Sequence, residues 1–384
     1  MADIIDSSAS TSTGRYLLNA ASLFLLRLSK LVVGLGAVVA AILYIKQDSM
    51  LYFPEIGGIP RRPSQNPRRY RSPSEHGIEF ETHKIACSDG VSIHAWLLLR
   101  DPNRLNDLPT IVFFHGNAGN IGLRLPNAIQ MMQYLNANVL MVEYRGYGES
   151  DGSPSEAGLK LDAEAALRFI LKHPKIDAAN VFLFGRSLGG AVALHLADYA
   201  QQQRLPVAGV IVENTFTNIA EMVDHLMPVI APLKGLVLRI RWDSMSIVPK
   251  LNTAVLYLAG ASDELVPHDH MIRLYKATGL SKLVKIHVIK DGTHNETWIK
   301  GGNEYWVAFR EFLNQAAKQT SLSSSAVTDN TQFPIRSHGP TILPVAAASS
   351  AIPIMPSNML NLAQESLRTK NSATATKIPG KKEL

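Results

Sequence analysis

The sequence predicts an α/β protein with a mostly parallel, doubly wound sheet, and three observations lead to this prediction. Six short runs of β-branched and aliphatic residues lack the polar alternation of half-exposed strands, as expected of central strands covered on both faces. They begin at residues 110, 137, 180, 207, 253 and 284. Helical stretches separate them, and in the clearest one, residues 156–173, apolar side chains share one face. Two earlier runs, residues 78–87 and 91–100, flank Ser-Asp-Gly and predict an antiparallel hairpin at one edge of the sheet.

The charge of the chain is unevenly distributed. The net charge is +6 over 384 residues, but residues 73–316 hold 22 basic and 25 acidic side chains, so the excess positive charge lies in the flanks. This distribution argues against a nucleic-acid groove and favours basic flanks near a membrane. The single cysteine, Cys87, forms no intrachain disulfide and is expected to pack on an early strand.

Residues 28–46 predict a transmembrane signal anchor that follows a short N-terminal segment, residues 1–27. Fifteen uncharged residues lie between Lys30 and Lys46. This is shorter than the roughly 20 residues that a spanning helix needs, but lysines at both ends reach back to the interface. No convincing cleavage signature follows, so an uncleaved anchor is favoured over a cleaved signal peptide or a buried helix. Residues 47–74 are then a juxtamembrane linker.

The basic residues on the two sides of the anchor favour opposite orientations. Arg15, Arg27 and Lys30 favour a cytosolic N-terminus, whereas the basic cluster at 61–71 opposes it. The C-terminal Lys-Lys-Glu-Leu resembles a retrieval signal that acts only in the lumen. We therefore expect a single-pass membrane protein of the endoplasmic reticulum or secretory pathway with a lumenal body. Residues 317–384 are rich in Ser, Thr, Ala and Pro, which predicts a disordered tail.

Ser187 is the candidate nucleophile. It lies in Gly-Arg-Ser-Leu-Gly, directly after one predicted strand and before a helical stretch. In such a strained strand-to-helix turn the neighbours two residues away must be very small, and the helix N-terminus faces any oxyanion that forms. A plain small-residue turn is the alternative.

Asp263 and His294 complete the chain order Ser, Asp, His that α/β-hydrolases use. Each follows a different predicted strand, and the carboxyl ends of parallel strands meet at one edge. Rival side chains lie close to both in the sequence: the carboxylates Asp291 and Glu264, and the imidazoles His268, His270 and His287.

The loop His-Gly-Asn-Ala-Gly, residues 115–119, is the candidate second half of an oxyanion hole. Two preorganised N–H donors are needed, and we assign them to the backbones of Leu188 and Asn117, with Ala118 as the rival of Asn117. His115 is expected to brace the loop. The loop lacks the Lys-Ser/Thr and Gly spacing of phosphate-binding loops, and no metal cluster is evident, so no cofactor and no metal are expected.

Several of these motifs resemble the membrane-anchored bud-emergence-type hydrolases. The resemblance covers about residues 48–316 and includes HGNAGN, GRSLGGAVA, ENTFTNIAEM and GTHNETW. It implies one N-terminal anchor, an α/β-hydrolase body and a Ser-Asp-His triad, whose motifs fall here on Ser187, Asp263 and His294. The long tail and the KKEL ending depart from the usual family pattern.

The substrate is the least defined property. The body is expected at 75–316, with a mainly apolar insertion at about 214–250 that forms either a small cap or a buried crossover. An apolar cap beside an anchor suggests a lipid or acylated substrate whose ester or thioester bond is cleaved. A serine peptidase, an acyltransferase and a non-catalytic membrane scaffold remain alternatives.

Overall fold

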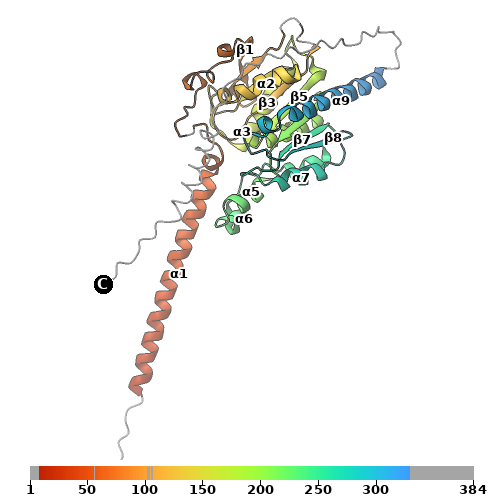
Figure 1. The fold of residues 1–384 in the computed structure, drawn as a ribbon. Coiled ribbons are helices and arrows are strands. Elements are labelled where there is room, and N and C mark those ends of the chain that lie inside the picture. The colour runs from red at the N-terminus through yellow and green to blue at the C-terminus, as the bar shows by residue number, and fades with distance from the viewer. Residues whose placement is uncertain (1–7, 56, 102–103, 105–106, 329–384) are drawn as a thin grey trace, which may run out of the picture.

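The computed structural model describes the chain outside residues 1–7, 56, 102–103, 105–106 and 329–384, and describes side chains from residue 19 to 319. Within these limits the body is an eight-stranded sheet with helices on both faces, from which the long helix α1 (Ser8–Leu51) projects (Figure 1). The strands lie in the order β1-β2-β4-β3-β5-β6-β7-β8. Their bounds are β1 Phe80–Ala86, β2 Ser92–Leu98, β3 Thr110–Phe114, β4 Asn138–Glu143, β5 Val181–Arg186, β6 Gly209–Glu213, β7 Val255–Gly260 and β8 Val284–Ile289.

The strand pairing matches the predicted sheet. β3 pairs in parallel with β4 and β5, and the parallel arrangement continues through β6, β7 and β8. β1 and β2 form an antiparallel hairpin, and β2 joins β4 in the antiparallel sense. The prediction of a mostly parallel α/β sheet with a hairpin at one edge is therefore confirmed.

Helices cover the sheet in two layers, which explains the continuous apolar strands. Along β5, Val181 and Leu183 belong to one core cluster, whereas Phe182 and Phe184 belong to the other. The first cluster includes side chains of α3, α4 and α7, and the second those of α2 and α9. The helix bounds are α2 Leu125–Leu135, α3 Glu156–Leu171, α4 Leu188–Gln202, α7 His268–Ala277, α8 Thr297–Lys300 and α9 Gly302–Thr328.

The edge strand β8 differs from the central strands. Residues of β8 are mostly half-buried, because only one neighbour, β7, pairs with it. This position explains why Lys285 and His287 occur within the strand.

Short turns of 3-10 helix connect the main elements. Outside the insertion, they are η1 Pro63–Gln65, η2 Pro73–His76, η4 Ile121–Arg124 and η5 Ala178–Asn180.

The segment after α1, expected as a linker, is packed on the body. Tyr52 is only 2% exposed and its hydroxyl accepts a hydrogen bond from Trp242 Nε1 at 2.9 Å. Phe53 N donates to Asn117 O at 2.9 Å, and Phe53 O accepts from Gly119 N at the same distance. Further along, the buried Asn66 exchanges side-chain hydrogen bonds with Asn120. The chain between α1 and β1 is therefore attached to the loop that follows β3.

Helix α1 has the length and composition of a membrane span. Its stretch Asn19–Leu51 comprises 33 residues, and its most apolar 18-residue window has a mean hydropathy of 2.2 and is not buried against the body. One N-terminal apolar helix of this kind fits a single-pass anchor.

At the other end, α9 extends to Thr328, past the expected body limit at 316. Residues 329–384, which hold most of the predicted tail and the KKEL ending, lie outside the described residues.

The insertion at 214–250, called the cap segment below, consists of short helical pieces. They are α5 Ile219–Leu226, η6 Ala231–Leu233, α6 Lys234–Val237, η7 Ser244–Ser246 and η8 Val248–Lys250. In Figure 1, α5 and α6 lie at the side of the body where α1 begins to project.

Candidate active site

Ser187 lies at the junction of β5 and α4 in a strained conformation. Its φ is 54° and its ψ is −121°, a region that residues with a side chain rarely adopt. A Cβ at Gly185 would lie 1.9 Å from Gly189 O, so the turn closes only because Gly185 has no side chain. Steric contact within the turn thus explains why glycines stand two residues before and two residues after Ser187.

The start of α4 packs tightly against the end of β3. A Cβ at Gly189 would lie 2.1 Å from Phe114 O, which leaves no space for any side chain. The same approach brings the loop after β3 to the nucleophile candidate, since a Cβ at Gly116 would lie 3.8 Å from Ser187 Cβ.

The two proposed oxyanion donors lie on either side of this contact. Leu188 is the first residue of α4, where a backbone N–H has no partner within the helix. Asn117 lies in the loop that meets Ser187, and its carbonyl accepts from Tyr147 Oη at 2.7 Å and from Phe53 N. The Asn117 side chain also donates to Leu51 O at 3.0 Å, so the loop is tied to the end of α1.

Asp263 and His294 are in direct contact. Asp263 Oδ2 lies 2.8 Å from His294 Nδ1, and the two side chains are only 2% and 4% exposed. The other oxygen, Asp263 Oδ1, accepts the backbone N–H groups of Leu265 and Val266 at 2.9 and 2.8 Å. The carboxylate therefore has a fixed orientation, and its contact at Nδ1 leaves Nε2 of the imidazole for a reacting group.

The rival side chains have other environments. Glu264 Oε2 accepts from the backbone N of His294 at 3.1 Å, so it supports the same loop. His270 is buried and its Nδ1 faces Thr217 Oγ1 at 2.8 Å. His287 lies within β8.

Asn214 is a supporting residue that the sequence analysis missed. It follows β6, is 1% exposed, and has a φ of 48°. Its Nδ2 lies 3.1 Å from Thr293 O, 3.2 Å from His294 O and 2.9 Å from Thr297 Oγ1, while its Oδ1 accepts from Gly260 N at 2.8 Å. This side chain links the ends of β6 and β7 to the loop of His294. The sequence signal was an asparagine directly after a strand, which tolerates the left-handed region better than most residues.

Below the turn lies a buried ionic network. Arg186 Nε donates to Glu213 Oε1 at 2.5 Å, and Tyr305 Oη donates to Glu213 Oε2 at 2.5 Å. Ser187 N in turn donates to Glu213 O at 2.9 Å. Because both charges are paired and out of water, this network holds the end of β5 in place.

His115 is fully buried beneath the loop that it was expected to brace. Its Nε2 lies 3.4 Å from Glu143 Oε1, and its Nδ1 lies 2.7 Å from Gly116 O. Burial raises the pKa of Glu143, against the opposing influence of His115. Glu143 Oε2 accepts from Ile121 N at 3.1 Å, so this pair ties β4 to the same loop.

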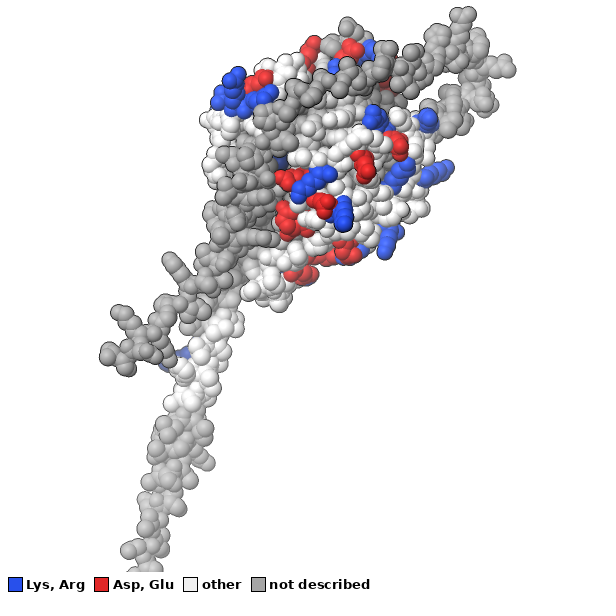
Figure 2. Space-filling model, viewed as in Figure 1, with Lys and Arg blue, Asp and Glu red and all other residues white. Residues whose placement is uncertain are grey.

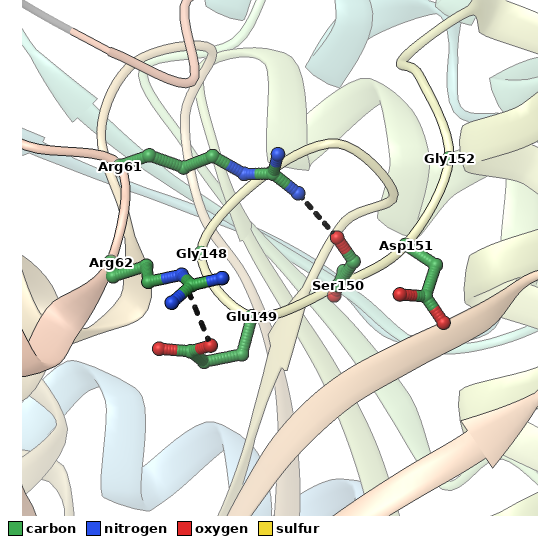
Figure 3. A pocket seen from close by; sticks show the side chains of 7 residues that line it. All are labelled: Arg61, Arg62, Gly148, Glu149, Ser150, Asp151 and Gly152. Atoms are coloured by element: carbon green, nitrogen blue, oxygen red, sulfur yellow. Dashed lines mark hydrogen bonds and ion pairs between the residues drawn. The ribbon is translucent and has the colours of Figure 1, made fainter.

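A hollow among the described residues lies away from Ser187, Asp263 and His294. It has a volume of about 280 Å³, and Figure 3 shows that Arg61 and Arg62 reach across it to the loop after β4. Arg61 donates to Ser150 O at 2.5 Å and Arg62 lies 3.6 Å from Glu149, so each guanidinium group already has one partner across the hollow. We assign no ligand to this hollow.

One group within the described residues has the make-up of a metal site. Glu81, His83 and His173 converge, and both imidazole Nε2 atoms lie 3.0 Å from Glu81 Oε2. His173 Nδ1 accepts from Lys175 N at 3.4 Å, which makes Nε2 a donor to the carboxylate. Lys175 Nζ contacts the other oxygen of Glu81 at 2.9 Å. These hydrogen bonds satisfy the cluster without an ion, and it lies at β1 rather than at the candidate site.

The surface of the body carries charges of both signs. On the face seen in Figure 2, acidic and basic side chains are interspersed, which is unlike the single-sign field of a nucleic-acid groove.

Comparison with known proteins places this geometry in a family. The profile of the family described as the alpha/beta hydrolase fold matches residues 109–239. The chain is 35% identical over 306 residues to the Arabidopsis thaliana alpha/beta hydrolase domain-containing protein WAV2. The matched region covers 76% of this chain and 96% of WAV2. It is 36% identical over 253 residues to protein bem46 of Schizosaccharomyces pombe, covering 66% of this chain and 82% of that protein.

A solved structure agrees with the fold. The Pyrococcus furiosus esterase Pf2001 superposes with a TM-score of 0.54 at 17% identity, covering 64% of this chain and 94% of the esterase. At this identity the likeness speaks for the fold alone. From the two relatives, the matching family profile and the sheet described above, we conclude that the chain belongs to the bem46-type α/β-hydrolase-domain proteins.

Proposed function

We propose that this protein is a membrane-anchored serine hydrolase that cleaves ester or thioester bonds of acyl or lipid substrates. The observation that carries the proposal is the buried 2.8 Å contact between Asp263 and His294, on loops after two different strands. Ser187, strained at the end of a third strand, supplies the nucleophile in this proposal.

The reaction would proceed through an acyl-enzyme. Ser187 Oγ attacks the carbonyl carbon while His294 Nε2 accepts its proton, and the imidazolium then donates that proton to the leaving group. Asp263 holds the imidazole in the required tautomer and stabilises its positive charge. The N–H groups of Asn117 and Leu188 stabilise the oxyanion. Water activated by His294 then releases the acyl group and regenerates the serine.

A fluorophosphonate probe tests the nucleophile. The full chain should be labelled, and Ser187→Ala should lose labelling completely. Ser262→Ala is a matched control, because Ser262 is an exposed serine directly before Asp263 and its hydroxyl donates to Lys290 O. Labelling that survives Ser187→Ala would exclude Ser187 as the nucleophile.

The substrate class is tested by acyl length. The apolar composition of the cap segment supports a substrate with an acyl chain, so kcat/KM for p-nitrophenyl esters should rise with chain length. A steady fall with length would contradict an acyl substrate. Matched thioesters and an added alcohol acceptor distinguish an esterase from a thioesterase or an acyltransferase.

We further propose that α1 spans the membrane with its N-terminus in the cytosol and the body in the lumen of the endoplasmic reticulum or secretory pathway. The support is the apolar stretch Asn19–Leu51 and the basic residues Arg15, Arg27 and Lys30, which precede the uncharged residues 31–45. The natural sequon at Asn295 is a poor reporter, because Thr297 is fully buried. An engineered acceptor sequon in the exposed loop before β8, made by Leu280→Asn with Lys282→Thr and compared with a sequon placed before α1, reports the side of the body. Glycosylation of only the sequon before α1 would reverse the orientation.

A further inference from the structure

The cap segment exposes a run of apolar side chains. Residues 226–237 read Leu-Met-Pro-Val-Ile-Ala-Pro-Leu-Lys-Gly-Leu-Val, with one charge in twelve positions. Val229 is 87% exposed and Leu236 is 81% exposed, and Leu226 and Leu233 are also exposed. The other large exposed apolar side chains that the structure describes outside α1 come from separate elements (Tyr134, Leu280 and Val288). Apolar residues concentrated in this way mark a surface that another phase or partner covers.

This run lies directly beside the apolar helix. A hollow of about 270 Å³ is bounded by one face of α1 and by α6. Its lining residues are Ala40, Ala41, Tyr44, Ile45, Leu236 and Val237. Figure 1 likewise shows α6 next to the end of α1 that meets the body.

Buried polar contacts hold α6 at this position. Gln47 is 8% exposed, and its Nε2 donates to Val237 O at 2.6 Å while its Oε1 accepts from Arg239 N at 2.8 Å. Arg239 also forms an ion pair with Asp48. Because both ends of the Gln47 amide are used, the cap segment is attached to the last turns of α1 rather than resting near them by chance.

The α1 residues that line the hollow give the depth of α6 in the bilayer. If residues 28–46 span the bilayer, as the anchoring part of the proposed function states, Ala41 lies about 7 Å inside the level of Lys46 at a rise of 1.5 Å per residue. Apolar surfaces that lie in the membrane interface reach roughly 5–10 Å into it. Leu236 lines the same hollow as Ala40, Ala41, Tyr44 and Ile45, so it lies within this range of depth.

The charges near the run suit the boundary of a bilayer. Lys234, the one charged residue of the run, is paired with Asp224 on α5, and Lys46 is exposed at the end of the expected span. Basic side chains at such a level reach the headgroups while their stems stay in apolar surroundings.

We propose that residues 226–237 form a second membrane contact that inserts into the bilayer interface next to α1. The occupant of this surface is lipid, because the apolar face continues without a break from the span of α1 through the shared hollow. The contact would hold the cap segment against the bilayer, so that substrates with acyl chains approach the body from the lipid phase.

Site-specific fluorescence tests this contact in the full chain reconstituted into phosphatidylcholine vesicles. An environment-sensitive thiol label is placed at Val229→Cys or Leu236→Cys in a Cys87→Ala background, with spin-labelled lipid as the quencher. The natural Cys87 is 6% exposed, and burial raises the pKa of its thiol to about 12, so its removal is a precaution against slow labelling. Both label sites point to the surface, so the labels should not disturb the fold.

Two further positions serve as controls. Val38→Cys, at an exposed residue within the expected span, reports the bilayer interior, and Leu280→Cys, 60% exposed on the body, reports water. We expect lipid quenching at 229 and 236 to reach at least half of that at 38, with little quenching at 280 and the reverse order for aqueous iodide.

Other outcomes overturn the proposal in distinguishable ways. Labels at 229 and 236 that behave like the label at 280 exclude the second contact, while quenching at 38 still supports the anchor. Absence of lipid quenching at 38 removes the anchor and this contact together. A label at 229 that is shielded from iodide but insensitive to spin-labelled lipid shows that protein, including a second copy of the chain, covers the surface. None of these readouts needs catalysis, so a failure of the proposed hydrolase activity is measured separately.

Discussion

Replacing Asn214 with alanine should damage the candidate site without touching Ser187, Asp263 or the His294 ring. The amide of Asn214 takes part in four contacts of 2.8–3.2 Å that join the ends of β6 and β7 to the loop of His294. The two N–H groups of Nδ2 and the accepting Oδ1 make at most three full hydrogen bonds at a time, so at about 1 kcal/mol for each their loss lowers the free energy of unfolding by about 3 kcal/mol. Alanine at the left-handed φ of 48° adds about 1 kcal/mol.

A matched variant separates these two contributions. Asn136 also has a left-handed φ, 51°, but it is exposed at the end of α2. Asn136→Ala should therefore cost only the backbone strain, about 1 kcal/mol. Denaturant unfolding of the full chain in detergent, with both variants beside the natural protein, gives the difference.

The catalytic readout is the rate of fluorophosphonate labelling and the hydrolysis of a short ester. Freed from Asn214, the carbonyls of residues 293 and 294 no longer hold the imidazole in register, so kcat should fall about 10²-fold with little change in KM. Asn136→Ala should leave both constants unchanged. If Asn214→Ala is no less stable than Asn136→Ala, or if kcat stays within twofold of the natural protein, Asn214 does not position His294.

Three further changes follow from the geometry. Asp263→Asn keeps the volume but favours the wrong imidazole tautomer, so kcat for a short ester should fall about 10⁴-fold, and a loss below tenfold would contradict its role. Gly189→Ala would place a methyl group 2.1 Å from Phe114 O and should abolish cooperative thermal unfolding by circular dichroism, whereas Gly235→Ala, with no atom within 4 Å, should not. Burial lowers the pKa of His94 from 6.5 to about 4, so between pH 6.5 and 4 the His94 imidazole is protonated in the unfolded chain but neutral in the folded chain. Stability is therefore lost as the pH falls, by about 2 kcal/mol at pH 5, and His94→Gln should remove this loss from denaturation midpoints compared at pH 7 and 5.

The sheet was predictable because its strands carry a local signal. The apolar runs at β3 to β7 lack alternation, and the structure places side chains of these strands in cores on both faces. The order of Ser187, Asp263 and His294 predicted which strand ends would meet, and the last two side chains lie in contact. The strands could be predicted because the pattern of apolar residues depends on neighbours in the sequence. The meeting of the strand ends could be predicted because the chain order of the motifs reflects the parallel topology.

Asn214 was not predictable in the same way. It is the first residue of the expected insertion at 214–250, but three of its partners lie about 80 positions further along the chain. Hydrogen bonds to such distant partners do not affect the local pattern of apolar and polar residues, so that pattern does not predict them. The same limit applies to Tyr52, which was expected in a linker but is bonded to Trp242 at a separation of 190 residues.

The packing of residues 47–53 changes how the proposed anchor relates to the site. Gln47 bonds the end of α1 to the cap segment, whereas the backbones of Leu51 and Phe53 bond the same short stretch to Asn117 in the proposed oxyanion loop. A flexible linker would let the body rotate freely above a membrane. Here the end of the helix is instead bonded to the cap segment, whose Thr215 donates to Ser187 O, and to the loop of Gly116 and Asn117 that meets Ser187. In the proposed anchored arrangement, the fold therefore sets the direction in which the site faces the bilayer, and any change that loosens Gln47 or Phe53 should alter activity toward membrane-embedded esters more than toward short soluble ones.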